Sequence, residues 1–219
     1  MRNVREIVQD KIMMLFLIAL AKEKSQIDGN LKFQKLFFLT EWKLMESNIK
    51  AFNFKFFRYR FGPFSKELWC DYNSLKEKKY VNSSFNLSDK AVDLIDYVHN
   101  SIQDIENNSE IIGLMSEICD TYSKYGGRAL TQKVYNMEIE PYDFPRTKMK
   151  IKDIPVFFDI LVPENFSADK ELRLPDFLIQ DLEQEFKGHD LTEEEEGQLM
   201  EESRNRLIEL ILSKGAPLN

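Results

Sequence analysis

Hydrophobic residues recur at helical spacing over most of the chain. The first such stretch runs from about Val4 to Lys24 with apolar side chains three and four positions apart, which predicts a helix with a buried face. The segment Asp28–Asn30 contains a glycine and ends this helix. A second helix is expected from Leu31 to Met45. It is apolar on nearly every side, so we expect it in the centre of a domain.

An aromatic segment follows these two helices. Between Phe54 and Phe61 rings alternate with charges, which favours a strand. Gly62-Pro63 interrupts it, and Pro63 is expected in the first turn of a helix that reaches about Lys79. A short hairpin around Asn82–Ser84 comes next. Periodicity then predicts three more helices, from Ser88 to about Ile105, from Ile111 to Tyr125 and from Ala129 to Met137.

The pattern changes after Met137. Four prolines fall between residues 138 and 166 and leave no room for a long helix; Val156–Val162 is either a buried strand or an extended segment on the body. Helical periodicity returns in Pro175–Phe186 and again after Thr192, which forms a capping box with Glu195.

The expected fold class is mainly α with a small β-hairpin or wing. We expect a winged-helix-like body over residues 1–137, an irregular connector over 138–166 and an acidic helical extension over 167–219.

Charge and composition narrow the classes of protein. The net charge is −7, of which residues 164–219 carry −9 and residues 1–163 carry +2, so the balance argues mildly against non-specific binding of nucleic acid. The two cysteines, Cys70 and Cys119, have no partner pattern, which favours a reducing compartment and a cytoplasmic protein. The apolar run Ile12–Ala21 is too short to span a membrane.

Three short motifs occur in the order of a known family. They are Gln34-Lys35-Leu36, Tyr59-Arg60-Phe61-Gly62-Pro63 and the segment Phe85–Ser88. Together they resemble the SocA-like or Panacea antitoxin group and its bacterial winged-helix relatives, over roughly Val4 to Met137. Phe61 stands where relatives have Tyr, and Leu87-Ser88 where they have Leu-Thr. The resemblance implies a non-enzymatic module that binds another protein, with Gln34, Lys35, Gly62 and Pro63 as structural signature positions.

No arrangement of reactive side chains points to catalysis, a cofactor or a metal. His99 and His189 lie far apart, and zinc needs three or four convergent ligands. The two cysteines lack a neighbouring base in sequence. Asp176, Glu185 and Lys187 could belong to a nuclease only if strands brought them together, whereas this stretch has helical spacing. The acidic run 193–196 is either a favourable helix N-terminus or a phosphate-mimicking surface.

One basic concentration remains as a candidate contact surface. It comprises Arg58, Arg60, Lys66, Lys76 and Lys79, interleaved with aromatic residues. Because alternate strand residues share a face, we expect Arg58 and Arg60 to point the same way.

The leading hypothesis is a protein-binding regulator, of antitoxin or adaptor type, that occludes a partner such as a toxin or a protease component. The alternative is a winged-helix DNA-binding regulator that uses the helix Phe64–Lys79. The apolar C-terminal helices could also form an oligomer contact.

Overall fold

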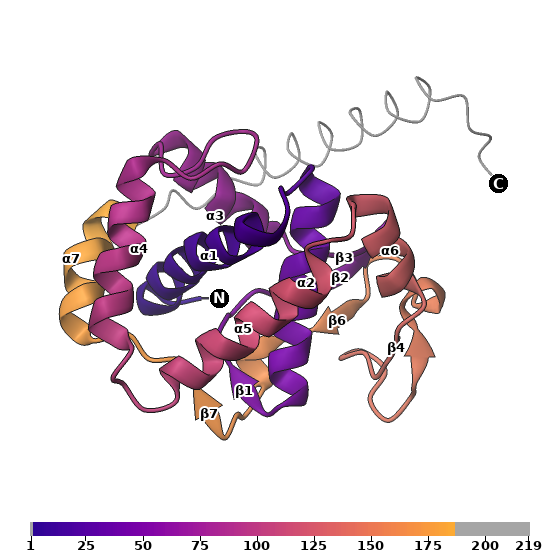
Figure 1. Cartoon of the computed structure of the whole chain (residues 1–219). Helices are drawn as coiled ribbons and strands as arrows, with labels where there is room; N and C mark the ends of the chain where they lie inside the picture. Colours follow the sequence, from indigo (N-terminus) through magenta and orange to yellow (C-terminus); the bar gives the residue numbers. More distant parts are fainter. Residues whose placement is uncertain (1, 187–219) are drawn as a thin grey trace. The chain divides into compact units, whose positions relative to one another are not determined.

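The computed structural model describes residues 2–186, and this part of the chain is mainly helical with short strands (Figure 1). The helices are α1 (Val4–Lys24), α2 (Asn30–Glu46), α3 (Lys66–Glu77), α4 (Asp89–Ile102), α5 (Asn108–Tyr122), α6 (Gly127–Tyr135) and α7 (Asp176–Phe186). The strands are β1 (Ile49–Lys50), β2 (Phe56–Tyr59), β3 (Gly62–Phe64), β4 (Glu138–Ile139), β5 (Met149–Lys150), β6 (Asp159–Leu161) and β7 (Lys170–Glu171), with short 3₁₀ helices η1 (Ile151–Asp153) and η2 (Pro163–Asn165). The expected fold class, mainly α with a small β component, is confirmed.

Helix α1 forms the centre of the molecule. Asn3 and Glu6 make the capping box at its start, and every residue from Asp10 to Ile18 is buried. Helices α3, α4, α5 and α7 all contact it (Figure 1). A helix enclosed in this way has no polar face, which explains why its apolar residues extend around the whole helix.

The second helix and the aromatic segment build an inner aromatic cluster. Its members are Phe33, Phe37, Phe52, Phe54, Tyr72 and Phe85. Neighbouring rings lie 4.7 to 6.3 Å apart between centroids, and each side chain is at most 6% exposed. Rings at these separations add to the free energy gained by burial alone, so this cluster stabilises the junction of α2, α3 and the aromatic segment.

A three-stranded sheet in the order β3-β2-β6 lies beside α2 and α6 (Figure 1). Both pairings are antiparallel, with Phe57 opposite Phe64 and Phe56 opposite Leu161. Pro63 lies in β3, and α3 begins at Lys66 with Ser65 as its N-cap. The expectation that Pro63 opens the helix is therefore wrong, because the strand continues through it at the sheet edge, where proline is tolerated.

The fold has no domain boundary at residue 137. Strand β6, from the proline-punctuated connector, completes the sheet with β2, and α7 packs against α1. Contacts group Met1–Lys187 into one unit, so the described parts of the connector and of the extension belong to the body. The expected hairpin is reduced to one antiparallel bridge, Val81 to Leu87. The second expected C-terminal helix and its capping box lie outside the described residues.

A network of buried charged side chains lies around the N-terminal half of α1. The guanidinium of Arg2 donates to Asp10 at 2.8 Å and to Asp71 at 2.6 Å. Asp10 also accepts from the backbone and side-chain nitrogens of Asn53, and the ammonium of Lys11 donates to the carbonyl of Phe186 at 2.8 Å. The network thus joins the N-terminus, α1, α3, the aromatic segment and α7.

Glu41 on α2 is a buried carboxyl of a different kind. It is 3% exposed, and neither carboxyl oxygen has a hydrogen-bond partner within residues 2–186. Burial, reinforced by the charges of Asp10 and Glu67, raises the pKa of Glu41 well above its ordinary value. A protonated side chain avoids the cost of an unpaired buried charge, so Glu41 is held as a neutral acid.

Candidate interaction surface

Strand β2 has an inverted burial pattern. Phe56 and Arg58 point inward and are buried, whereas Phe57 and Tyr59 point outward and are half-exposed. Charged side chains ordinarily take the solvent side of a strand. Two aromatic rings are thereby presented on the outside of the sheet, and a guanidinium is placed beneath it.

The outward rings join two others in an outer aromatic cluster, made of Phe57, Tyr59, Phe64 and Phe157. Centroid distances within it run from 5.7 to 6.4 Å. Phe157 is the most open of the four, with 67% of its side chain exposed. The next residue, Phe158, is 39% exposed and stacks on Phe144 at 5.0 Å. We call these six rings the outer aromatic face.

The backbone of Phe157 holds its ring in this position at a cost. Its φ is +73°, a region that bulky residues rarely occupy and that costs on the order of 1–3 kcal/mol. Two hydrogen bonds to Arg58 fix the loop: the amide of Phe157 donates to the Arg58 carbonyl at 2.6 Å, and the Arg58 amide donates to the Phe158 carbonyl at 2.8 Å. The strained residue is therefore also the most exposed ring of the cluster.

Arg58 lies directly behind this face. Its Nε donates to the carbonyl of Ile151 at 3.0 Å, and its guanidinium carbon lies 5.0 Å from the centre of the Tyr135 ring. Its Nη1 has no hydrogen-bond partner within residues 2–186. At 7% exposure, Arg58 is not a contact residue, contrary to the expectation that it shares a solvent face with Arg60. Arg60 itself is exposed in the turn after β2.

The four signature positions meet at the edge of β3. The amide of Gln34 exchanges two hydrogen bonds with the backbone of Ser65, at 2.9 and 3.2 Å, and the ammonium of Lys35 donates to the carbonyl of Pro63 at 2.7 Å. Gly62 has φ +94°, and a Cβ there would lie 3.1 Å from the Tyr135 ring and 3.3 Å from the Lys35 side chain. These contacts give the four residues a structural role beneath the outer aromatic face.

Lys35 and Arg58 are two neighbouring cations buried inside the protein. Burial, followed by the charge of Arg58, lowers the pKa of Lys35 to about 7. No carboxylate within residues 2–186 forms an ion pair with either cation. At neutral pH Lys35 is accordingly near the point where it loses its charge.

Neither edge of the sheet is free to accept another strand. On one side, the Gln34 side chain exchanges hydrogen bonds with the backbone of Ser65, just after β3, and Lys35 donates to the Pro63 carbonyl in β3. On the other side, the amides of Tyr142 and Asp143 donate to carbonyls of β6 at 3.0 and 3.3 Å. A partner would therefore meet the rings on the face of the sheet, since adding a strand requires open backbone groups.

The remaining basic candidates lie on α3 and just after its end. Lys66 is half-exposed in the first turn of this helix. At the other end, Lys76 donates to Asn73 at 3.1 Å and Lys79 is exposed with φ +61°. Lys76 and Lys79 line a shallow depression of about 320 Å³ with the hairpin residues 81–83 and 86–88. The structure therefore splits the basic set between two sites.

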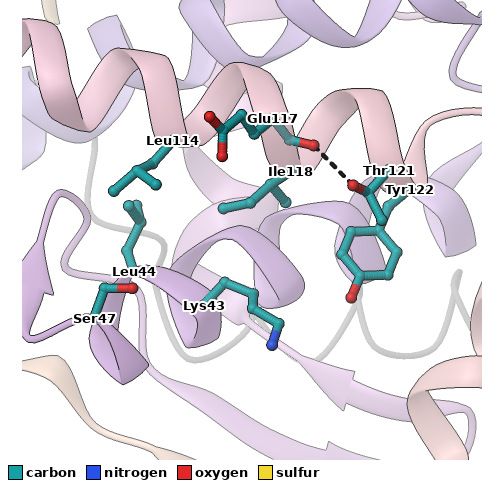
Figure 2. A pocket seen from close by; sticks show the side chains of 8 residues that line it. All are labelled: Lys43, Leu44, Ser47, Leu114, Glu117, Ile118, Thr121 and Tyr122. Atoms are coloured by element: carbon teal, nitrogen blue, oxygen red, sulfur yellow. Dashed lines mark hydrogen bonds between the residues drawn. The ribbon is translucent and has the colours of Figure 1, made fainter.

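A second groove of about 320 Å³ runs between α2 and α5. Figure 2 shows its lining residues: Lys43, Leu44, Ser47, Leu114, Glu117, Ile118, Thr121 and Tyr122. The Thr121 hydroxyl donates to the Glu117 carbonyl of its own helix, and Lys43 pairs with Glu46 at 2.8 Å. Thr121 and Lys43 are thus engaged within their own helices.

Cys70, Cys119 and His99 lie on helices, and of these only Cys119 is buried. Burial raises the pKa of the Cys119 thiol to about 12, which suppresses the reactive thiolate. The ring of His99 lies 6.2 Å from that of Phe16. Cys70 is half-buried on α3, and His189 lies outside the described residues.

The suggested nuclease residues do not converge. Asp176 pairs with Arg5 at the start of α7, while Glu185 pairs with Lys90 near its end; Lys187 and the acidic run 193–196 lie outside the described residues. Within residues 2–186 no three His, Cys, Asp or Glu side chains gather to hold a metal. None of the helices in that range combines the length and hydropathy of a membrane span.

The sequence did not point to Phe144, Phe157 or Phe158 as surface residues. Their only signal was a concentration of rings inside a proline-punctuated connector, where few core positions are available. Comparisons of the chain with protein-family models, with curated proteins and with solved structures found no match.

Proposed function

We propose that this chain is a non-enzymatic regulator of antitoxin or adaptor type, acting in the cytoplasm. It binds a partner protein, such as a toxin or a protease component, through the outer aromatic face and thereby occludes it. The observation that carries the proposal is Phe157, a bulky residue at φ +73° with 67% of its side chain exposed. Strain of this kind is retained where the surrounding structure enforces it, often at binding sites, and exposed aromatic groups are favoured anchors of protein interfaces.

The test is a comparison of two exposed phenylalanines. Phe177 on α7 is 49% exposed and lies outside the outer aromatic face, so Phe177→Glu is the matched control for Phe157→Glu. Affinity-tagged wild type and both variants are expressed in the native cells, and proteins that co-purify are quantified by mass spectrometry. We expect a partner to be retained by the wild type and by Phe177→Glu and to be lost with Phe157→Glu. Equal recovery with both variants would rule out this surface.

DNA binding is the second candidate function. It is supported by the depression in which Lys76 and Lys79 meet the hairpin, since a winged helix places such residues against phosphates. Acidic residues of α3 oppose it in part: Glu77 is exposed beside these lysines. A gel-shift titration with a mixed-sequence duplex tests this candidate. Binding at low salt that is lost in Lys76→Glu/Lys79→Glu supports it, and absence of binding at low salt rejects it.

A further inference from the structure

The segments that build the outer aromatic face are strongly basic in an acidic chain. Residues 55–66 and 142–158 together contain eight basic and two acidic side chains, whereas the chain as a whole has a net charge of −7. The aromatic and basic residues therefore coincide in two segments that are distant in sequence. The hydrogen bonds between Arg58 and residues 157 and 158 bring these segments together in the fold.

Several of these cations lie close to the rings in sequence. Arg60 follows Tyr59 directly, and its carbonyl accepts a hydrogen bond from the Tyr135 hydroxyl. Lys152 belongs to η1, which begins at Ile151, the residue that accepts from Arg58. Arg146 and Lys148 come shortly after Phe144, which stacks on Phe158. Arg60, Arg146, Lys148 and Lys152 are all exposed.

These four cations differ from many surface lysines of the same protein. Lys24, Lys90 and Lys170 each form an ion pair with a carboxylate at 2.7 to 3.0 Å. Within residues 2–186, no ion pair involves Arg60, Arg146, Lys148 or Lys152. Lys55, in the same region, is neutralised by Asp159 at 2.6 Å. The four exposed cations that accompany the outer aromatic face in sequence are thus not paired with a carboxylate within residues 2–186.

We infer that the partner meets this face with an acidic protein surface that has an apolar centre. The inference rests on the proposed function and adds the chemistry of the partner. The apolar centre covers Phe157 and its neighbouring rings, and the surrounding carboxylates of the partner pair with the bordering cations. Complementary charge of this kind speeds encounter and fixes orientation, while the buried rings supply most of the affinity.

A protein fits these observations better than a nucleic acid. The rings meet at mixed angles, 72° between Phe57 and Phe64 and 23° between Phe57 and Phe157. Because they pack on one another, they form a joint apolar surface in place of separate ring faces for stacked bases.

The experiment uses the full chain with p-benzoyl-phenylalanine at position 157, expressed in the native cells. Lysates adjusted to 50 or to 300 mM NaCl are then cross-linked by light, and the cross-linked molecule and its attached segment are recovered, quantified and identified by mass spectrometry. The same chain is compared with Arg60→Glu/Lys152→Glu and with a control, Lys22→Glu, an exposed lysine at the end of α1. We expect a partner segment of net negative charge, a recovery about fivefold lower at the higher salt, a similar loss in the double variant and no loss in the control.

The other outcomes are distinguishable. If the cross-linked partner is a protein whose recovery is insensitive to salt and to Arg60→Glu/Lys152→Glu, the acidic surface is wrong while the proposed function stands. If no protein is cross-linked at position 157, the proposed function itself fails at this surface. A cross-linked product that is destroyed by nuclease assigns the face to nucleic acid and overturns both. Circular dichroism melting of each variant confirms that all of them are folded.

Discussion

The inner and outer aromatic clusters use the same kind of residue for opposite purposes. One segment of the chain supplies both, with Phe52 and Phe54 in the inner cluster and Phe57 and Tyr59 in the outer one. The inner rings are almost completely buried, whereas Phe157 is 67% exposed. Burial area is what makes an aromatic ring stabilising, so the inner rings contribute strongly to folding and Phe157 contributes little. The outer cluster is retained despite strain in its backbone.

The cations beside the two clusters also differ, in whether they are paired with carboxylates. Arg2 lies 5.1 Å from the Phe54 ring and is paired with two carboxylates. Arg58 lies behind the outer cluster. Its neighbours are the carbonyl to which it donates, one tyrosine ring and the cation Lys35. The comparison indicates that the inner region stabilises the fold. The outer region has features that stability alone does not require.

The largest expected difference comes from deleting one ring in each cluster. Phe54→Ala leaves a cavity in the core and should lower the free energy of unfolding by about 3–5 kcal/mol, because Phe54 is fully buried. Phe157→Ala should change it by less than about 0.5 kcal/mol. Urea unfolding followed by circular dichroism measures both variants. Equal destabilisation would show that the outer cluster is part of the core.

The second prediction concerns the paired cation of the inner region. Arg2→Met removes the partner of two buried carboxylates, Asp10 and Asp71, and breaking a buried pair in this way costs about 3 kcal/mol or more. Arg5→Met is the control, since the pair of Arg5 with Asp176 is exposed on both sides and should contribute less than about 1 kcal/mol. The midpoint of urea unfolding compares the two variants, and a similar loss in both would contradict the assigned role of Arg2.

The sequence predicted the helices well because their signal is local. Helix α1 was expected at the bounds at which it occurs, and α2 to within one residue at each end. Periodicity needs no knowledge of distant contacts. The signature positions were expected to be structural. In the fold Gln34 bonds to the backbone of Ser65, and Lys35 donates to the carbonyl of Pro63 in the neighbouring strand.

The orientation of β2 could not be predicted in the same way. Arg58 points inward because Ile151 and Tyr135, more than seventy residues away in sequence, provide its partners. No pattern within the strand reveals them. The positive φ of Phe157 is equally hidden, because two hydrogen bonds to another strand impose it against the preference of the residue.

A third prediction separates the two regions by pH. The pKa of Lys35 is lowered to about 7 in the folded protein and is about 10.4 in the unfolded chain. Below pH 7 both states are protonated, and the full cost of burying the charge is present. Between pH 7 and about 10 the unfolded state binds more protons, so the contribution of Lys35 to stability improves as the pH rises. Lys35→Met should be more stable than the wild type by about 1–2 kcal/mol at pH 6.

The measurement is the difference in the free energy of unfolding between Lys35→Met and wild type, taken from pH 6 to pH 9. Taking this difference cancels other titrating groups that the two proteins share. We expect the advantage of the variant to shrink steadily above pH 7. If the advantage stays constant over this range, Lys35 keeps its charge from pH 6 to pH 9. Its pKa is then not lowered by the fold, and Lys35 does not distinguish the outer region from the inner one.

The smallest expected effect isolates the strain at Phe157 from the loss of its ring. Glycine adopts positive φ without penalty, whereas alanine there retains the clash of its Cβ with the backbone. Phe157→Gly should therefore be more stable than Phe157→Ala by about 1 kcal/mol. At Val156, exposed and without a positive φ, the same pair of substitutions should show no such advantage for glycine. Both variants at position 157 lose the ring and should lose the partner, so their difference in stability reports the strain alone. Equal stability of the two variants would mean that the positive φ of Phe157 stores no strain.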